Sequence, residues 1–281
     1  MWIVYVLPGI AVLAVLMTLL LLKPGKRRPT TPASPVPFAH RGLHSGDSRI
    51  PENSLAAFRQ AAQKGFAVEL DIQLTADGQV VVFHDATLMR LCQIDSRVDA
   101  LTYEELKQYP LLGSDQHIPL LSQVLEVLDG VPLLCEFKSM RSFTDTRICS
   151  AAWPLLASYK GPVWIESFNP LLVRWFKRNH PQVMRGILSM RFKKDNKEVT
   201  PLQGKLLTAL LTNALTKPDF IAYQLSDHRE HAFRLCRWLY RPLTLAWTVR
   251  SPEEEQEAKN AGFDGVIFEG FLPEEKKFEN F

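Results

Sequence analysis

Short apolar runs alternate with amphipathic segments along most of the chain, and this alternation constrains the fold more than any other feature. Runs such as FAVELDI (66–72) and VPLLCEF (131–137) have the length and composition of buried strands. The segment SPEEEQEAKNAG (251–262) has a serine cap, a proline in its first turn and a terminating glycine, which is typical of a helix. We expect strands at 37–40, 66–72, 80–84, 131–137, 163–167, 184–189, 219–223, 243–249 and 264–268, and helices at 53–64, 119–129, 170–180, 227–239 and 252–261.

The number and order of these elements favour a closed barrel over an open sheet. Eight or nine strands with helices between them, over about 240 residues, match a (β/α)₈ barrel. The glycine-rich signatures GxGxxG and GxxxxGK[ST], common among nucleotide-binding open sheets, do not occur in the sequence. The predicted fold class is therefore α/β, a TIM barrel, in which functional side chains gather where the strands end.

The N-terminus has a different character from the rest of the chain. The segment WIVYVLPGIAVLAVLMTLLLL (2–22) carries no charge and reaches the ~20 residues that a helix needs to cross a bilayer. A cleaved signal peptide is the alternative, but no basic region precedes the apolar run. Because basic residues follow it in KPGKRRP (23–29), we expect the rest of the chain on the cytoplasmic side. The predicted organisation is a transmembrane anchor at 1–22, a basic and proline-rich linker at 23–36, and a barrel domain at 37–281.

Charge and cysteine content exclude some classes of protein. The net charge of +3 is too small to indicate a nucleic-acid partner. The four cysteines form no CxxC pair, so we expect free thiols rather than a disulfide framework. The sequence does not indicate an oligomeric state.

Three acidic residues fall on predicted strands. Glu69 and Asp71 are two residues apart and therefore lie on the same side of their strand, and Glu136 lies on another apolar strand. Unpaired buried carboxylates would each cost several kcal/mol, so the acids need partners. A structural salt bridge is one solution. A set of oxygen ligands without histidine or cysteine favours the other, a single hard divalent cation, Mg²⁺ or Ca²⁺.

Two histidines close predicted strands near these acids. His40 and His84 are each followed by a charged residue, and imidazoles beside a metal can divide general-base and general-acid work. Arg41, next to His40, is suited to bidentate contact with a phosphate, and Lys138 could bind a phosphate as a point charge. Glu52 in PENS (51–54) either caps the helix that starts near residue 53 or holds Arg41.

Six short motifs occur together, in one order, along nearly all of the chain after the linker. They are HRG (40–42), PENS (51–54), ELDIQLTADGQVVVFHD (69–85), CEFK (135–138), ESF (166–168) and WTV (247–249). In these motifs the chain resembles the glycerophosphodiester phosphodiesterase family, over about Phe38 to Phe268. PENS differs slightly from the more usual Glu-Asn-Thr of that family and keeps the hydroxyl.

The resemblance implies a TIM barrel with a small insertion after the second βα unit, where LTYEELKQYPLL (101–112) lies. It implies hydrolysis of glycerophosphodiesters to glycerol 3-phosphate and an alcohol, or of lysophospholipids to lysophosphatidic acid by membrane-linked members. By position it implies metal ligands Glu69, Asp71 and Glu136, an acid/base pair His40 and His84, and substrate-binding residues Arg41, Lys138, Trp247 and Glu52.

Two alternative functions stay open at this point. One is cleavage like that of a C-type phospholipase, and the other is a phosphate-binding barrel without turnover. The sequence also leaves open which histidine is the base, and whether water or the 2-hydroxyl of the substrate is the nucleophile.

Overall fold

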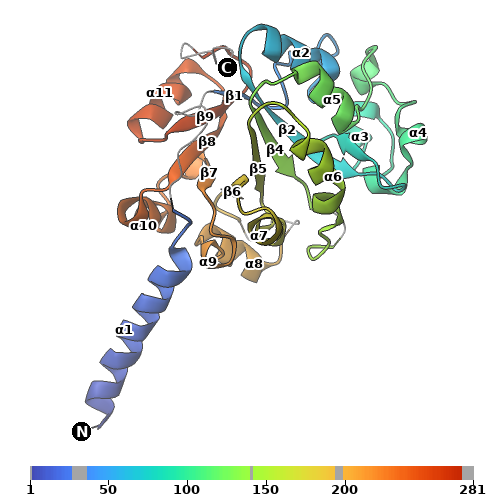
Figure 1. Cartoon of the computed structure of the whole chain (residues 1–281). Helices are drawn as coiled ribbons and strands as arrows, with labels where there is room; N and C mark the ends of the chain where they lie inside the picture. Colours follow the sequence, from blue (N-terminus) through green and yellow to red (C-terminus); the bar gives the residue numbers. More distant parts are fainter. Residues whose placement is uncertain (1, 27–36, 140–141, 194–198, 274–281) are drawn as a thin grey trace.

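The computed structural model describes residues 2–26, 37–139, 142–193 and 199–273. Eight parallel strands form a closed barrel, because β1 pairs with both β2 and β9 (Figure 1). The predicted TIM barrel is therefore confirmed. Its strands are β1 (Phe38–Ala39), β2 (Ala67–Leu74), β4 (Leu133–Phe137), β5 (Val163–Ser167), β6 (Met184–Ser189), β7 (Phe220–Gln224), β8 (Leu243–Val249) and β9 (Gly265–Phe268).

Helices cover the outside of the barrel. Serine caps begin two of them, and the sequence predicts the second: Ser54 accepts a hydrogen bond from the Ala57 backbone amide, and Ser251 accepts one from the Glu254 backbone amide. The outer helices are α2 (Leu55–Gln63), α5 (Leu121–Leu128), α6 (Arg147–Ala157), α7 (Pro170–Asn179), α8 (Pro201–Thr208), α9 (Asn213–Thr216), α10 (His231–Tyr240) and α11 (Pro252–Asn260).

One predicted strand does not belong to the barrel. The run at 80–84 forms β3 (Val80–Val82), which pairs antiparallel with β2. The reversal occurs in the turn 75–78, where the Gly78 amide donates to the Thr75 carbonyl and Gly78 adopts a φ of 80°. An apolar run has the same composition in a parallel and an antiparallel strand, so its pattern could not predict this pairing.

The insertion consequently lies inside the second βα unit, between β2 and α5, and not after that unit as predicted. It consists of β3, α3 (Met89–Cys92), η1 (Val98–Ala100), α4 (Tyr103–Leu106) and η2 (Leu111–Gly113). It has a hydrophobic core of its own, made of Val81, Phe83, Leu88, Leu91, Val98, Leu106, Leu111 and Ile118.

Helix α1 (Trp2–Leu22) extends away from the barrel, and only its last turns are packed against it (Figure 1). Leu22 is buried, and its carbonyl accepts a hydrogen bond from the side-chain amide of Asn213 at 2.9 Å. The membrane anchor predicted over residues 1–22 is not confirmed, since no helix within the described part of the chain is long and apolar enough to cross a membrane. Within α1 that part does not include the side chains of residues 2–8 and 11. The predicted linker lies largely outside the described residues, at 27–36.

Candidate active site

Strand β2 presents its two sides to different surroundings. Val68, Leu70 and Ile72 pack in the cluster between the barrel and its helices, whereas Ala67 belongs to the cluster inside the barrel. Because side chains alternate along a strand, Glu69 and Asp71 also face the interior. Two carboxylates thus occupy positions that a strand of ordinary composition would fill with apolar residues.

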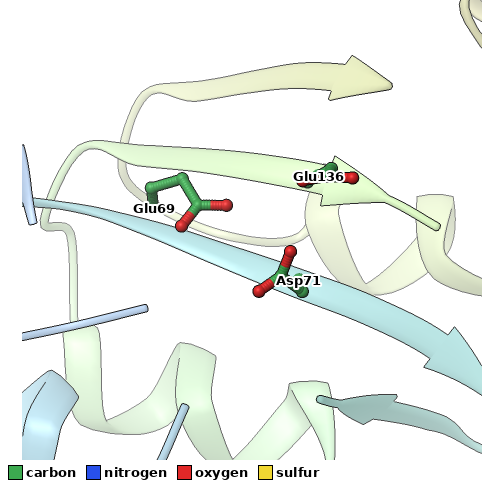
Figure 2. Close-up of side chains that lie close together, drawn as sticks. All are labelled: Glu69, Asp71 and Glu136. Carbon is green, nitrogen blue, oxygen red and sulfur yellow. The ribbon is translucent and has the colours of Figure 1, made fainter. Parts of the chain in front are cut away.

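The third predicted ligand lies beside them on β4. Asp71 is in register with Glu136, and Figure 2 shows the three carboxylates of Glu69, Asp71 and Glu136 close together on the two neighbouring strands. One oxygen from each lies within 4.8 Å of the others, and all three residues are buried. The structure therefore brings together the predicted acidic cluster.

Basic groups partly neutralise the cluster. Lys138 Nζ lies 2.8 Å from Asp71 Oδ1 and 2.7 Å from Glu136 Oε1. Arg41 Nε lies 3.4 Å from Asp71 Oδ2, and the Arg41 backbone amide donates to Glu69 Oε2 at 2.9 Å. Residue 41 adopts a left-handed φ of 56°. The two basic residues predicted to bind phosphate therefore lie at the cluster.

The three carboxyls differ in pKa, because burial and neighbouring charges act on each of them differently. It raises the pKa of Glu69 well above its ordinary value, and the charges of Asp71 and Glu136 raise it further. Burial also raises the pKa of Glu136, against the opposing effect of Lys138. At Asp71 the cationic groups, led by Lys138, outweigh burial and hold its pKa well below the ordinary value. Asp71 is thus the most acidic of the three.

His40 follows β1 and is held by a carboxylate. Its Nδ1 lies 2.7 Å from Glu269 Oε2, and its Nε2 lies 4.0 Å from Glu69 Oε2. A proton on Nδ1 satisfies Glu269 and leaves Nε2 directed at the cluster. Burial lowers the pKa of His40 to about 4, although the hydrogen bond to Glu269 opposes this shift. His40 is therefore neutral at pH 7 and can accept a proton.

His84 follows β3 and is held in the same manner. Its Nδ1 lies 2.6 Å from Asp85 Oδ1. Gln73 fixes the backbone on both sides of it, because the Gln73 side-chain amide donates to the carbonyls of Phe83 and Asp85 at 2.8 Å each. The Phe83 amide in turn donates to the Asp71 carbonyl at 2.9 Å. The insertion thus delivers His84 to the strand that carries two of the three acids.

A chain of ion pairs connects Arg41, which follows His40, with Asp85, which follows His84. Glu52 accepts from Arg41 Nη1 at 2.7 Å, and Arg90 on α3 donates to Glu52 at 2.7 and 2.8 Å. Arg90 Nε also donates to Asp85 Oδ2 at 2.6 Å. Since Ser54 caps α2, the structure decides between the two interpretations of Glu52: it holds Arg41.

Aromatic and polar side chains on β5 and β8 also belong to the site. Trp247 on β8 lies against Phe168, with ring centroids 5.5 Å apart and planes nearly perpendicular. Its indole Nε1 is buried and has no hydrogen-bond partner among the described residues. Glu166 on β5 is in register with Glu136, and burial raises its pKa well above the ordinary value. The site therefore has, on its later strands, the aromatic ring of Trp247, with an Nε1 donor left unpaired by the described part of the chain, and a fourth buried acid, Glu166.

Sequence reasoning missed several residues of this arrangement. It did not identify Arg90, or Gln73, or Asn53, whose buried amide donates to Asp71 Oδ2 at 2.9 Å. The PENS motif does contain this asparagine, and its left-handed φ of 54° is a conformation that asparagine tolerates better than most residues. Arg90 carries no comparable signal, because an arginine on a short helix is ordinarily a surface residue.

The residues of the cluster fit a hard divalent cation. The donors are carboxylate oxygens alone, they are buried, and one oxygen of each can reach a common centre. The Lys138 ammonium bonded to two of them is itself a cation at this position, which supports the need for positive charge there. Both Mg²⁺ and Ca²⁺ take oxygen donors of this kind.

Comparison with known proteins agrees with this site. The model of the glycerophosphoryl diester phosphodiesterase family matches residues 40–270. A glycerophosphodiester phosphodiesterase from Caldanaerobacter subterraneus is 32% identical over 246 residues, which cover 80% of this chain and 91% of that protein. A lysophospholipase D from Rattus norvegicus is 31% identical over 158 residues, covering 50% of this chain and 48% of that protein.

Solved structures share the fold of this chain. A phosphodiesterase from Oleispira antarctica, determined in complex with the product sn-glycerol-3-phosphate, has a TM-score of 0.69 and 25% identity, covering 85% of this chain and 94% of that one. A glycerophosphodiester phosphodiesterase from Parabacteroides distasonis shares the fold, with a TM-score of 0.64 over 83% of this chain and 92% of that one, at 24% identity. The chain is therefore an enzyme that belongs to the glycerophosphoryl diester phosphodiesterase family.

Proposed function

We propose that this chain hydrolyses glycerophosphodiesters to sn-glycerol 3-phosphate and an alcohol by acid/base catalysis with His40 and His84. The observation that carries the proposal is the pair of histidines, each held through Nδ1 by a carboxylate, at a buried cluster of three acids and two bases. The relative from Oleispira antarctica, solved with sn-glycerol-3-phosphate, supports the substrate class.

The residues divide the reaction among them. Glu69, Asp71 and Glu136 would hold one divalent cation, which supplies charge neutralisation at the phosphate and acidifies an attacking hydroxyl. Arg41 is positioned to bind a phosphate oxygen, and its ion pair with Glu52 fixes the direction of its guanidinium. Trp247 would pack against the glycerol or the leaving alcohol with its apolar face.

Each histidine handles one proton. One Nε2 removes a proton from the nucleophile as it bonds to phosphorus, and the other donates a proton to the alkoxide as its bond to phosphorus breaks. The carboxylates Glu269 and Asp85 keep the Nδ1 protons in place, so that Nε2 is the reactive atom of both rings. Such acid/base groups typically increase the reaction rate by 10²–10⁴-fold each.

Alanine substitution tests these assignments. H40A and H84A should each lower kcat by roughly 10²–10⁴-fold while cation affinity stays near that of the wild type. D71N should instead weaken cation binding, measured by calorimetry. The control is H117A, since His117 is an exposed histidine of the insertion. Turnover at the wild-type rate by the double variant H40A/H84A would refute the acid/base assignment.

The proposal includes a second class of substrate and the side of the membrane on which the barrel lies. The rat lysophospholipase D supports lysophospholipids as a second substrate class, cleaved to lysophosphatidic acid. The uncharged segment 2–22 and the basic residues after it support a barrel tethered on the cytoplasmic side of a membrane. A reporter enzyme that works only in the cytoplasm should be active when fused to the C-terminus. A C-terminal fusion to a reporter that works only outside the cytoplasm should be inactive, and activity of this second fusion would refute the orientation.

A further inference from the structure

Arginines lie on helix α10 and at its C-terminal end. Arg234 and Arg237 are three residues apart on the helix, and Arg241 is the residue that follows its last turn. With five further residues they line an open depression of about 430 Å³ on the surface of the barrel. These residues are Trp238, Pro242, Thr244, Gly262 and Asp264.

The depression has a net positive charge, because three arginines line it with one acid, Asp264, whose charge acts on Arg237. Arg234 and Arg241 are exposed and form no ion pair with any of the described residues. Arg237 is fixed in place: it donates to the Gly262 carbonyl, and its guanidinium lies 5.4 and 5.3 Å from the ring centroids of Phe233 and Phe263. The acid in the depression, Asp264, accepts hydrogen bonds from the backbone amide and hydroxyl of Thr244. Guanidinium groups arranged in this way are suited to a phosphate.

Apolar side chains lie beside the arginines on the same helix. Trp238 is 76% exposed, the largest value among the exposed large hydrophobic side chains of the described residues, and Leu235 and Leu239 are 38% and 36% exposed. A helix with basic residues, an exposed tryptophan and exposed leucines has the composition of helices that lie in the interface of a bilayer. Tryptophan in particular concentrates at the level of the headgroups.

The position of α10 points to the same surface. The Tyr240 hydroxyl donates to the Leu19 carbonyl of α1 at 2.8 Å, so the end of α10 is fixed to the last turns of α1. Figure 1 shows α10 beside the point where α1 leaves the barrel. Lys23 and Lys26, immediately after α1, are exposed. Farther along α1 the exposed apolar side chains are Ile10, Val12, Leu13, Val15, Leu16, Met17 and Leu20.

We propose that the outer face of α10 is a docking surface for an anionic phospholipid bilayer, in which Arg234, Arg237 and Arg241 bind headgroup phosphates and Trp238 enters the interface. A face that is both cationic and apolar complements headgroup phosphates and the glycerol region below them. The hydrogen bond from Tyr240 to Leu19 fixes the end of α10 to the last turns of α1, which expose apolar side chains. The barrel is thereby held in one orientation on the lipid surface.

Vesicle flotation of the full chain tests the proposal. Partition coefficients are measured on vesicles of phosphatidylcholine alone and on vesicles with one third phosphatidylglycerol. The ratio of the second coefficient to the first, anionic over neutral, is compared between variants. The apolar contribution of α1 cancels in this ratio. At about 1 kcal/mol for each arginine near the surface, R234Q/R241Q should lower the ratio by roughly 25-fold, and high salt should lower the wild-type ratio. Both arginines are exposed, so hydrolysis of glycerophosphocholine in solution should not change.

R59Q/K64Q is the matched control. It removes the same charge from exposed positions on and just after α2, at the opposite end of the molecule from α1 in Figure 1, and should leave the ratio within about twofold. A second readout is the quenching of Trp238 fluorescence by brominated lipid, taken as the difference between the wild type and W238F. Trp238 should be quenched more strongly on anionic vesicles.

Three outcomes would overturn the proposal. The first is a wild-type ratio near one with Trp238 unquenched. The second is an equal loss in R234Q/R241Q and in R59Q/K64Q, which would reduce the effect to overall charge. The third is a dimer of the full chain that R234Q/R241Q dissociates, which would assign the face to a second copy.

Discussion

At the scale of single residues, the site depends on carboxylates that orient histidines. His40 and His84 come from unrelated parts of the chain, yet each directs Nδ1 at a carboxylate, Glu269 or Asp85. The sequence placed both histidines at the ends of strands. It could not predict the pairing of His40 with Glu269, because these residues are far apart in sequence and become neighbours only when β1 pairs with β9.

Arg90 is the residue that links the two halves of the site, and its replacement tests the link. R90M removes the contacts to Glu52 and Asp85 together, which frees both Arg41 and His84 to move. Because small misplacements of reacting groups cost up to about 100-fold in rate, we expect kcat to fall roughly 10- to 100-fold, with R90K in between.

R97M is the control for Arg90. Arg97 lies in the same insertion and forms its ion pair with Asp99, away from the site. Its loss should change kcat by no more than about twofold. Equal kinetics of R90M and R97M would show that the link between Glu52 and Asp85 does not position either catalytic region.

The raised pKa values of Glu69 and Glu136 predict a pH-dependent cation affinity. Both carboxyls retain protons at pH values where an ordinary glutamate is ionised, and binding of a cation requires their release. Affinity should therefore rise with pH, by up to about tenfold per pH unit for each proton released. Calorimetry in buffers of different ionisation enthalpy counts these protons.

E69Q provides the comparison for the proton count. It should release fewer protons than the wild type on binding the cation and show a shallower pH dependence. A cation affinity that does not change with pH in the wild type would contradict the assignment of these carboxyls as ligands.

At the scale of elements, the insertion is a small unit that carries one catalytic group. Its own hydrophobic core lies outside the barrel, and His84 follows its only strand, β3. The apolar pattern at 80–84 predicted a strand, but not its antiparallel pairing, because the direction depends on the turn at 75–78. The capped helices were easier to predict, since their signals are local.

Loosening the insertion should affect activity more than the fold. Leu106 is fully buried in the core of the insertion, and L106A removes packing worth about 2–5 kcal/mol there. We expect faster hydrogen exchange in residues 98–118, a lower kcat through His84, and little change in exchange within β4 to β7. Mass spectrometry of exchanged peptides gives both measurements.

L156A is the matched variant in the barrel domain. Leu156 is buried between α6 and the barrel, so its loss should cost a similar free energy of unfolding while kcat of the folded protein stays near that of the wild type. An L106A protein with rapid exchange in the insertion and normal kcat would mean that the insertion does not hold His84 in place.

At the scale of the whole molecule, the sequence predicted the barrel but not all of its connections. The alternation of strands and helices was sufficient for the closed barrel, because each parallel strand needs a helical crossover. The acidic cluster was also predictable, since charged residues on a buried strand require partners. The ion-pair chain through Arg90 was not, because it depends on how the insertion folds back over the turn before α2.

The most direct test of the account is metal-dependent product formation. The purified chain is stripped with EDTA, resupplied with Mg²⁺ or Ca²⁺, and given glycerophosphocholine, with products identified by mass. We predict no turnover without a cation, and release of free choline with sn-glycerol 3-phosphate when one cation is restored. Release of phosphocholine with glycerol, or full turnover in EDTA, would contradict it.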